Sequence, residues 1–60
     1  MTYDFTYKDN EGDTYQSDQH TTLSGAKAEW EKIKEFHDGD CHIDETWIYD
    51  DNGNFKGRWR

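Results

Sequence analysis

The chain has 60 residues, and 14 Asp and Glu against 7 Lys and Arg give it a formal net charge of −7. A chain of this length buries one core, so residues 1–60 are expected to form a single domain. The charge disfavours direct contact with nucleic acid phosphates, and no apolar stretch approaches the about 20 residues that cross a bilayer. We therefore expect a cytoplasmic protein without membrane contact, since a signal peptide is also absent.

The composition predicts a folded domain with an aromatic core. Hydrophobic residues make up only 30% of the chain, but three Trp, four Tyr and three Phe bury large areas per residue. Cys41 is the only cysteine, so an internal disulfide is excluded and a reducing compartment is expected.

Residues 2–8 predict a first strand, because apolar and polar side chains alternate along them. Three rings share one face of it: Tyr3, Phe5 and Tyr7. Residues 9–12 place Asp first and Gly fourth, which favours a type I turn closed by a left-handed glycine. The turn predicts a second strand over residues 14–19. It pairs Tyr7 with Tyr15 and Phe5 with Ser17.

A helix is predicted over residues 23–37, with Thr22 as its N-cap and Gly39 as a left-handed residue after its end. Its apolar side recurs at steps of three and four residues, which is the spacing of a helix face packed on a sheet. This stripe comprises Leu23, Ala26, Trp30, Ile33 and His37. Ion pairs are expected between Lys27 and Glu31 and between Glu31 and Lys34.

Alternation resumes over residues 41–49, which predicts a third strand, and residues 50–53 repeat the Asp-first, Gly-fourth turn. The last hairpin is then expected to pair Tyr49 with Phe55, Trp47 with Gly57 and Glu45 with Trp59. This register turns Trp47 and Tyr49 toward the core and Ile48 outward. Because it also turns Glu45 inward, a β-bulge near Glu45 is expected.

The order of elements predicts an α+β domain of ββαββ topology, with a four-stranded, mainly antiparallel sheet and one helix packed on one face. The other face should be polar, as an uncovered sheet face is. The residues expected there are Asp4, Thr6, Lys8, Gln16, Asp18, His42, Asp44, Thr46, Lys56, Arg58 and Arg60.

The stretch from His37 to Glu45 contains two imidazoles, a thiol and four carboxylates, which are potential metal ligands or catalytic groups. Cys41 and His42 should point to opposite faces of a strand, whereas a tetrahedral site needs four convergent ligands. The carboxylates should raise the pKa of the Cys41 thiol, which disfavours a nucleophilic role. The sequence therefore predicts no metal, no cofactor and no enzymatic activity, and treats Cys41 as a small hydrophobic residue.

Acidity is concentrated after the middle of the chain, because residues 35–55 hold seven acids and no Lys or Arg. One interpretation is a solvated surface that keeps the protein soluble. The other is a surface for a basic partner, with carboxylates in place of phosphates. The predicted binding residues are Asp38, Asp40, Asp44, Glu45, Asp50 and Asp51.

Two segments, TLSGAKA at residues 22–28 and IYDDNGNF at residues 48–55, resemble short acidic proteins encoded by bacteriophages and mobile elements. In size and acidity the chain is similar to anti-CRISPR proteins and other phage inhibitors of host defence, several of which act as DNA mimics. The resemblance implies a non-enzymatic inhibitor or adaptor, monomeric or homodimeric, that binds a host protein such as a CRISPR complex subunit. The alternatives are a small nucleic-acid-binding module that uses the open sheet face and a structural homo-oligomeric domain.

Overall fold

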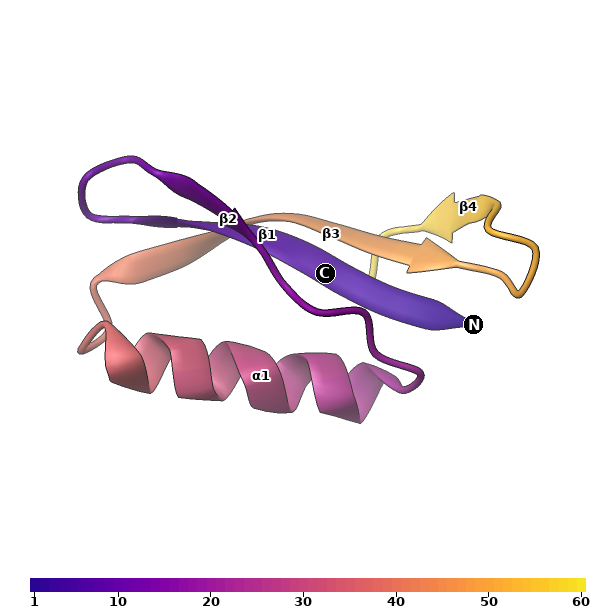
Figure 1. Ribbon diagram of the computed structural model, residues 1–60, viewed down its shortest axis with the longest axis horizontal. Helices are drawn as coiled ribbons and strands as arrows, with labels where there is room; N and C mark the ends of the chain where they lie inside the picture. Colours follow the sequence, from indigo (N-terminus) through magenta and orange to yellow (C-terminus); the bar gives the residue numbers. More distant parts are fainter.

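The computed structural model describes residues 1–60, and the predicted α+β fold class is confirmed. The elements in chain order are β1 (Thr2–Asp9), β2 (Thr14–Gln16), α1 (Leu23–Phe36), β3 (Cys41–Tyr49) and β4 (Phe55–Gly57). All four strands pair antiparallel in the order β2-β1-β3-β4. Helix α1 lies along one face of the sheet and leaves the other face open (Figure 1).

The first hairpin has the predicted turn and register. The Asp9 N–H donates to the Asp13 carbonyl, and the Asp9 carboxylate accepts the N–H groups of Glu11 and Asp13 at 2.9 and 3.0 Å. Tyr7 lies opposite Tyr15, and their rings stack with centroids 5.2 Å apart. An Asp side chain that accepts backbone N–H groups of its own turn stabilises the turn locally, so the turn depends little on contacts with the core.

The second strand is shorter than predicted, because β2 ends at Gln16 instead of residue 19. Ser17 still faces Phe5, as expected, but its Oγ atom accepts the Phe5 N–H at 2.9 Å in place of a backbone carbonyl. The chain pairs with β1 again only at His20, opposite Tyr3. The Ser17 side chain thus takes the place of a backbone acceptor and interrupts the β1–β2 ladder, which the sequence pattern predicted to continue to residue 19.

The helix begins as predicted, with Thr22 as its N-cap: the Thr22 Oγ1 atom accepts the Gly25 N–H at 3.1 Å. It ends at Phe36, one residue before the predicted end, and His37 is the C-cap. Gly39 has the expected positive φ, 78°, and its N–H donates to the Lys34 carbonyl at 2.7 Å. Of the two expected helix ion pairs only Glu31–Lys34 forms, at 2.9 Å.

The core lies between α1 and the two central strands, β1 and β3. Its buried apolar residues are Phe5, Ala26 and Trp30. Phe5 has no exposed surface, and the rings of Trp30 and Trp59 pack edge-on against it at centroid distances of 5.8 and 5.9 Å. Edge-to-face contacts of this kind add to the hydrophobic stabilisation of a small core.

The expected bulge near Glu45 is confirmed. Phe5 pairs with Thr46 and Tyr7 with Ile43, so Asp44 and Glu45 together lie opposite the single residue Thr6. An extra residue shifts the period-two alternation by one position, and every later side chain of β3 changes face.

The faces predicted for the end of β3 are therefore wrong. Trp47 pairs with Asp4 and lies on the open face, and Tyr49 follows it there. Thr46, expected on the open face, is 3% exposed on the helix side, and Ile48 lies on that side too. The prediction assumed that the residues after the bulge alternate in step with Ile43, which faces the core. The bulge instead reverses which of these residues face the core.

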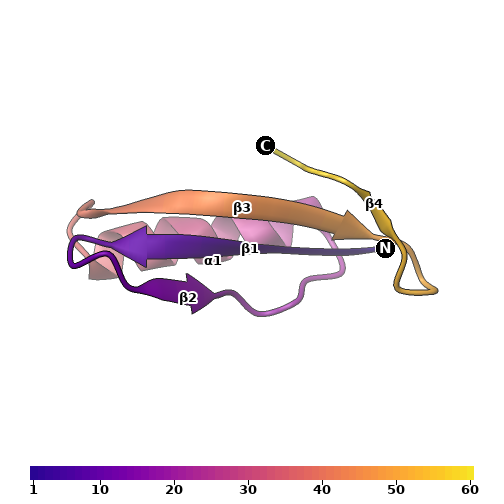
Figure 2. The ribbon, with the colours of Figure 1, turned by 90° about the horizontal axis from the view of Figure 1, so that it is seen from above.

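A second irregularity lies in the last hairpin. Tyr49 pairs with Phe55 as expected, but Gly57 pairs with Ile48 rather than with Trp47, because the ladder accommodates one extra residue of β4. The segment after β4 runs back along the outer side of β3 (Figure 2). Trp59 is consequently not paired with Glu45 in the ladder: its Nε1–H donates to the Asp4 carbonyl at 2.9 Å, and its ring packs against the core.

Candidate functional site

The six predicted binding residues follow β3 from one end to the other. Asp38 and Asp40 precede the strand, and Asp44 and Glu45 form its bulge. Asp50 and Asp51 follow its last residue and lie in the β3–β4 turn. Nine strand residues span about 30 Å. The turn between α1 and β3 and the turn between β3 and β4 lie at opposite ends of the molecule (Figure 1), whose longest extent is 35 Å. The six carboxylates therefore form a row and not one contiguous patch.

Three of these six acids contact cations of the chain itself. Glu45 pairs with Arg58 at 3.4 Å, Asp50 with Lys56 at 3.7 Å, and Asp51 with the Met1 ammonium at 2.6 Å. All three pairs are accessible to solvent, so each contributes little to stability and can be exchanged for contacts with a partner. None of the ion pairs involves Asp38, Asp40 or Asp44.

Asp50 also has a structural role in the β3–β4 turn. Its Oδ1 atom accepts the backbone N–H groups of Asn52 and Asn54, both at 2.9 Å. The N–H of Asn54 is the main cause of a pKa below the usual carboxyl value, although partial burial opposes it. Asp50 thus holds a negative charge in place at neutral pH.

The open face bears a cavity of about 460 Å³ beside this turn, which we call the acidic hollow. It is lined by Thr2, Asp4, Gln19, Tyr49, Asp50, Asp51 and Gly53. Two predicted binding residues, Asp50 and Asp51, thus meet a third carboxylate. That residue is Asp4, which the sequence placed on the open face but did not single out.

Asp4 is unusual because it is a carboxylate with only 6% of its surface exposed. Its Oδ1 atom has no hydrogen-bond partner. Burial raises the pKa of this carboxyl above its ordinary value, and a hydrogen bond to the Gln19 side chain opposes the shift only in part. A buried acceptor without a partner lowers the stability of the fold. The Asp4 Oδ1 atom can still accept a hydrogen bond from a donor that enters the hollow.

The open face also carries aromatic side chains next to this cavity. Trp47 and Tyr49 lie on it, and Tyr49 contacts Phe55 with ring centroids 6.1 Å apart. Phe55 is 56% exposed. Sequence reasoning missed this cluster because it placed all three rings on the core face of the sheet. The expected bulge near Glu45 was the signal that could have corrected it.

The stretch from His37 to Glu45 is divided between the two sides of the sheet. Cys41 packs beside the core, whereas His42 pairs with Lys8 on the open face. In this structure no group of three or more His, Cys, Asp or Glu side chains is arranged to hold a metal ion. Burial first, and then the charge of Asp40, raise the pKa of the Cys41 thiol.

We expect Cys41 to react slowly with a thiol reagent, because the reactive thiolate is scarce when the pKa is raised. Alkylation by iodoacetamide at pH 7.5 should be slower in the folded protein than in urea, where the sequence is the same but burial is lost. Mass spectrometry over time measures both rates. A folded-state rate equal to or above that in urea would contradict the structural role of Cys41.

Comparisons of the chain with protein-family models, curated proteins and solved structures give no match. The single helix of the structure is too short and too polar to span a membrane.

Proposed function

We propose that this protein is a non-enzymatic inhibitor or adaptor that binds a host protein with a basic surface through its row of carboxylates. The partner class is a nucleic-acid-processing protein, such as a CRISPR complex subunit, and the carboxylates stand in for phosphates. The proposed binding residues remain Asp38, Asp40, Asp44, Glu45, Asp50 and Asp51, to which Asp4 is added.

The observation that carries the proposal is the buried Asp4 carboxylate in the acidic hollow. A buried charge without a partner destabilises a domain, and a small domain has little stability to lose. An Arg or Lys side chain of a partner supplies the missing donor. Gln19 is exposed in an irregular segment, so its side chain can move aside to admit it.

The geometry of the remaining acids supports the same proposal. The row extends about 30 Å along β3, which is close to one turn of duplex DNA, about 34 Å. Asp38, Asp40 and Asp44 are exposed at one end and the middle of the row, and the acidic hollow lies at the other end. A groove that binds duplex phosphates presents basic side chains over a comparable length.

The test is a tagged pull-down from nuclease-treated bacterial lysate, at low and high salt, with two double variants of equal charge change. Asp44→Lys with Asp51→Lys alters the row, and Asp13→Lys with Asp18→Lys alters exposed acids outside it. We expect the first pair to reduce capture of the partner roughly tenfold and the second to leave it nearly unchanged.

Circular dichroism of both variants confirms that they are folded before capture is compared. Equal capture by the unaltered protein and the Asp44/Asp51 variant would remove the acidic row as the binding surface. Equal loss of capture in both variants would show that net charge alone, and not the position of the acids, causes the effect.

A second candidate function is favoured by the aromatic cluster of the open face. Trp47, Tyr49 and Phe55 are placed as the stacking residues of RNA-binding sheets are. The net charge of −7 opposes it. A gel-shift assay with single-stranded oligonucleotides at low salt decides between the two, because only the second function predicts a shift.

A further inference from the structure

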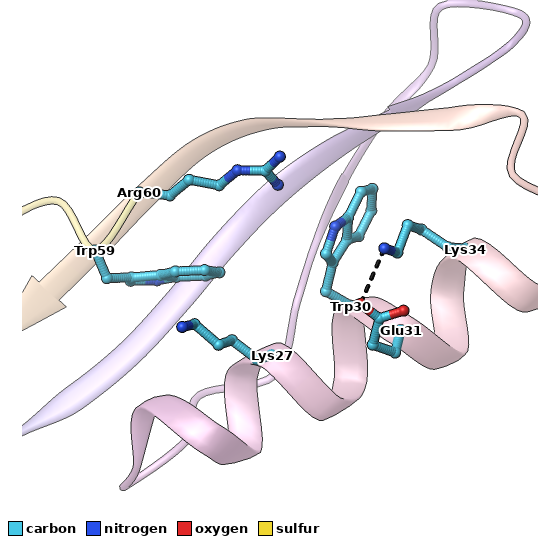
Figure 3. Close-up of a pocket in the computed structure, with 6 residues that line it drawn as sticks. All are labelled: Lys27, Trp30, Glu31, Lys34, Trp59 and Arg60. Atoms are coloured by element: carbon cyan, nitrogen blue, oxygen red, sulfur yellow. Dashed lines mark hydrogen bonds and ion pairs between the residues drawn. The ribbon is translucent and has the colours of Figure 1, made fainter.

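A second cavity lies on the helix side of the sheet, between α1 and the C-terminal segment (Figure 3). It has a volume of about 340 Å³ and does not touch the acidic hollow; we call it the tryptophan cavity. Its lining residues are Lys27, Trp30, Glu31, Lys34, Trp59 and Arg60.

The charge of this cavity is opposite to that of the whole chain. Three of the seven Lys and Arg residues line it, against one acid, Glu31, which is already paired with Lys34 at 2.9 Å. Lys27 and Arg60 take part in none of the ion pairs. An otherwise acidic protein therefore offers two unpaired cations at one cavity.

The walls of the cavity are aromatic and fixed from behind. The Trp59 indole is anchored by its hydrogen bond to the Asp4 carbonyl, and the Trp30 ring packs on Phe5. In Figure 3 the two indole rings border the space, Lys27 extends into it from α1, and Arg60 lies on the far side of the Trp59 ring from Lys27. Trp59 is only partly buried, so part of its ring can be contacted.

Lys34 and the backbone of Arg60 are held near these rings by the fold. The Lys34 Nζ atom lies 5.8 Å from the centroid of the Trp30 ring. The backbone of Arg60 is fixed by Thr46, whose Oγ1 accepts the Arg60 N–H at 3.2 Å and donates to its carbonyl at 3.4 Å. A ligand thus meets preformed aromatic walls, with the exposed side chains of Lys27 and Arg60 beside them.

We propose that the tryptophan cavity binds a nucleoside monophosphate, with the base against the face of the Trp59 indole on the side of Lys27 and the phosphate at the Lys27 ammonium group. A flat base matches an aromatic wall, and a phosphate matches an unpaired ammonium group. A small anion fits better than a long polyanion, because the net charge of −7 repels phosphates that lie beyond the cavity. This site is separate from the surface of the proposed function and does not depend on it.

The test is an NMR titration with adenosine 5′-monophosphate, which follows the indole N–H signals of the three tryptophans. We expect saturable shifts at Trp59 and Trp30 and none at Trp47, which lies on the open face and is an internal control. Adenosine and inorganic phosphate should each bind at least about tenfold more weakly than the nucleotide, because each lacks one half of the contacts. A single-stranded oligonucleotide that shifts Trp59 more strongly than the nucleotide would overturn the preference for a small anion.

A matched pair of helix variants tests the residues. Lys27→Gln removes a cavity cation, whereas Lys32→Gln removes an exposed lysine of the same helix that does not line the cavity. We expect the first to weaken nucleotide binding about fivefold and the second to change it less than twofold. The proposal is overturned if the nucleotide produces no saturable shift, if Trp47 shifts instead, or if the two variants weaken binding equally.

Discussion

Replacement of Phe5 by alanine is expected to lower the free energy of unfolding by about 3–5 kcal/mol, the usual cost of deleting a buried phenyl ring. Phe5 has no exposed surface, and both Trp30 and Trp59 pack against its ring. A 60-residue domain has about 3–9 kcal/mol in total, so most of its stability should be lost. Urea unfolding followed by tryptophan fluorescence at 25 °C measures the change.

Phe36→Ala is the matched control, because the same ring is deleted from a residue that is 84% exposed. We expect a change within about 0.5 kcal/mol. Similar losses in the two variants would contradict the position of the core between α1 and the central strands.

Replacement of Asp4 by asparagine is expected to raise the free energy of unfolding at pH 7 by about 1 kcal/mol, since it removes a buried, incompletely paired charge. Asparagine keeps the shape of the side chain, so its contact with the Gln19 side chain should persist. Asp44→Asn controls for the change in net charge, because Asp44 is exposed on the same sheet, and it should have little effect.

The pH dependence of this gain identifies its cause. Burial raises the pKa of Asp4 in the folded protein, so the folded state binds this proton more tightly than the unfolded state does. The favourable contribution of protonated Asp4 is complete below the ordinary carboxyl pKa of 3.8 and is lost as pH rises through the folded-state pKa. The advantage of Asp4→Asn should therefore be largest at neutral pH and should shrink toward about pH 3.

Urea unfolding of both proteins between pH 3 and pH 7 measures this difference. An advantage that stays constant across the range would show that the charge of Asp4 is not its source. If the variant is more stable but captures less of the proposed basic partner, Asp4 is a residue at which binding is gained at the cost of stability.

Local patterns in the sequence determined most of the secondary structure. Alternation located β1 and β3, the two Asp-first, Gly-fourth turns located both hairpins, and Thr22 fixed the start of α1. These features depend on hydrogen bonds and side-chain periods within a few residues, so a single sequence is enough to find them. The acidic composition of residues 35–55 likewise defined the candidate binding residues.

Only the tertiary structure decided which side chains meet. The bulge at Asp44 and Glu45 turned Trp47 to the open face, and the extra residue of β4 directed Trp59 into the core. Each shift of one residue reverses all later faces, and its position depends on pairing with a strand far away in the chain. For the same reason the sequence alone did not reveal that Asp4 joins Asp50 and Asp51 in a hollow, or that two tryptophans and three cations line a cavity.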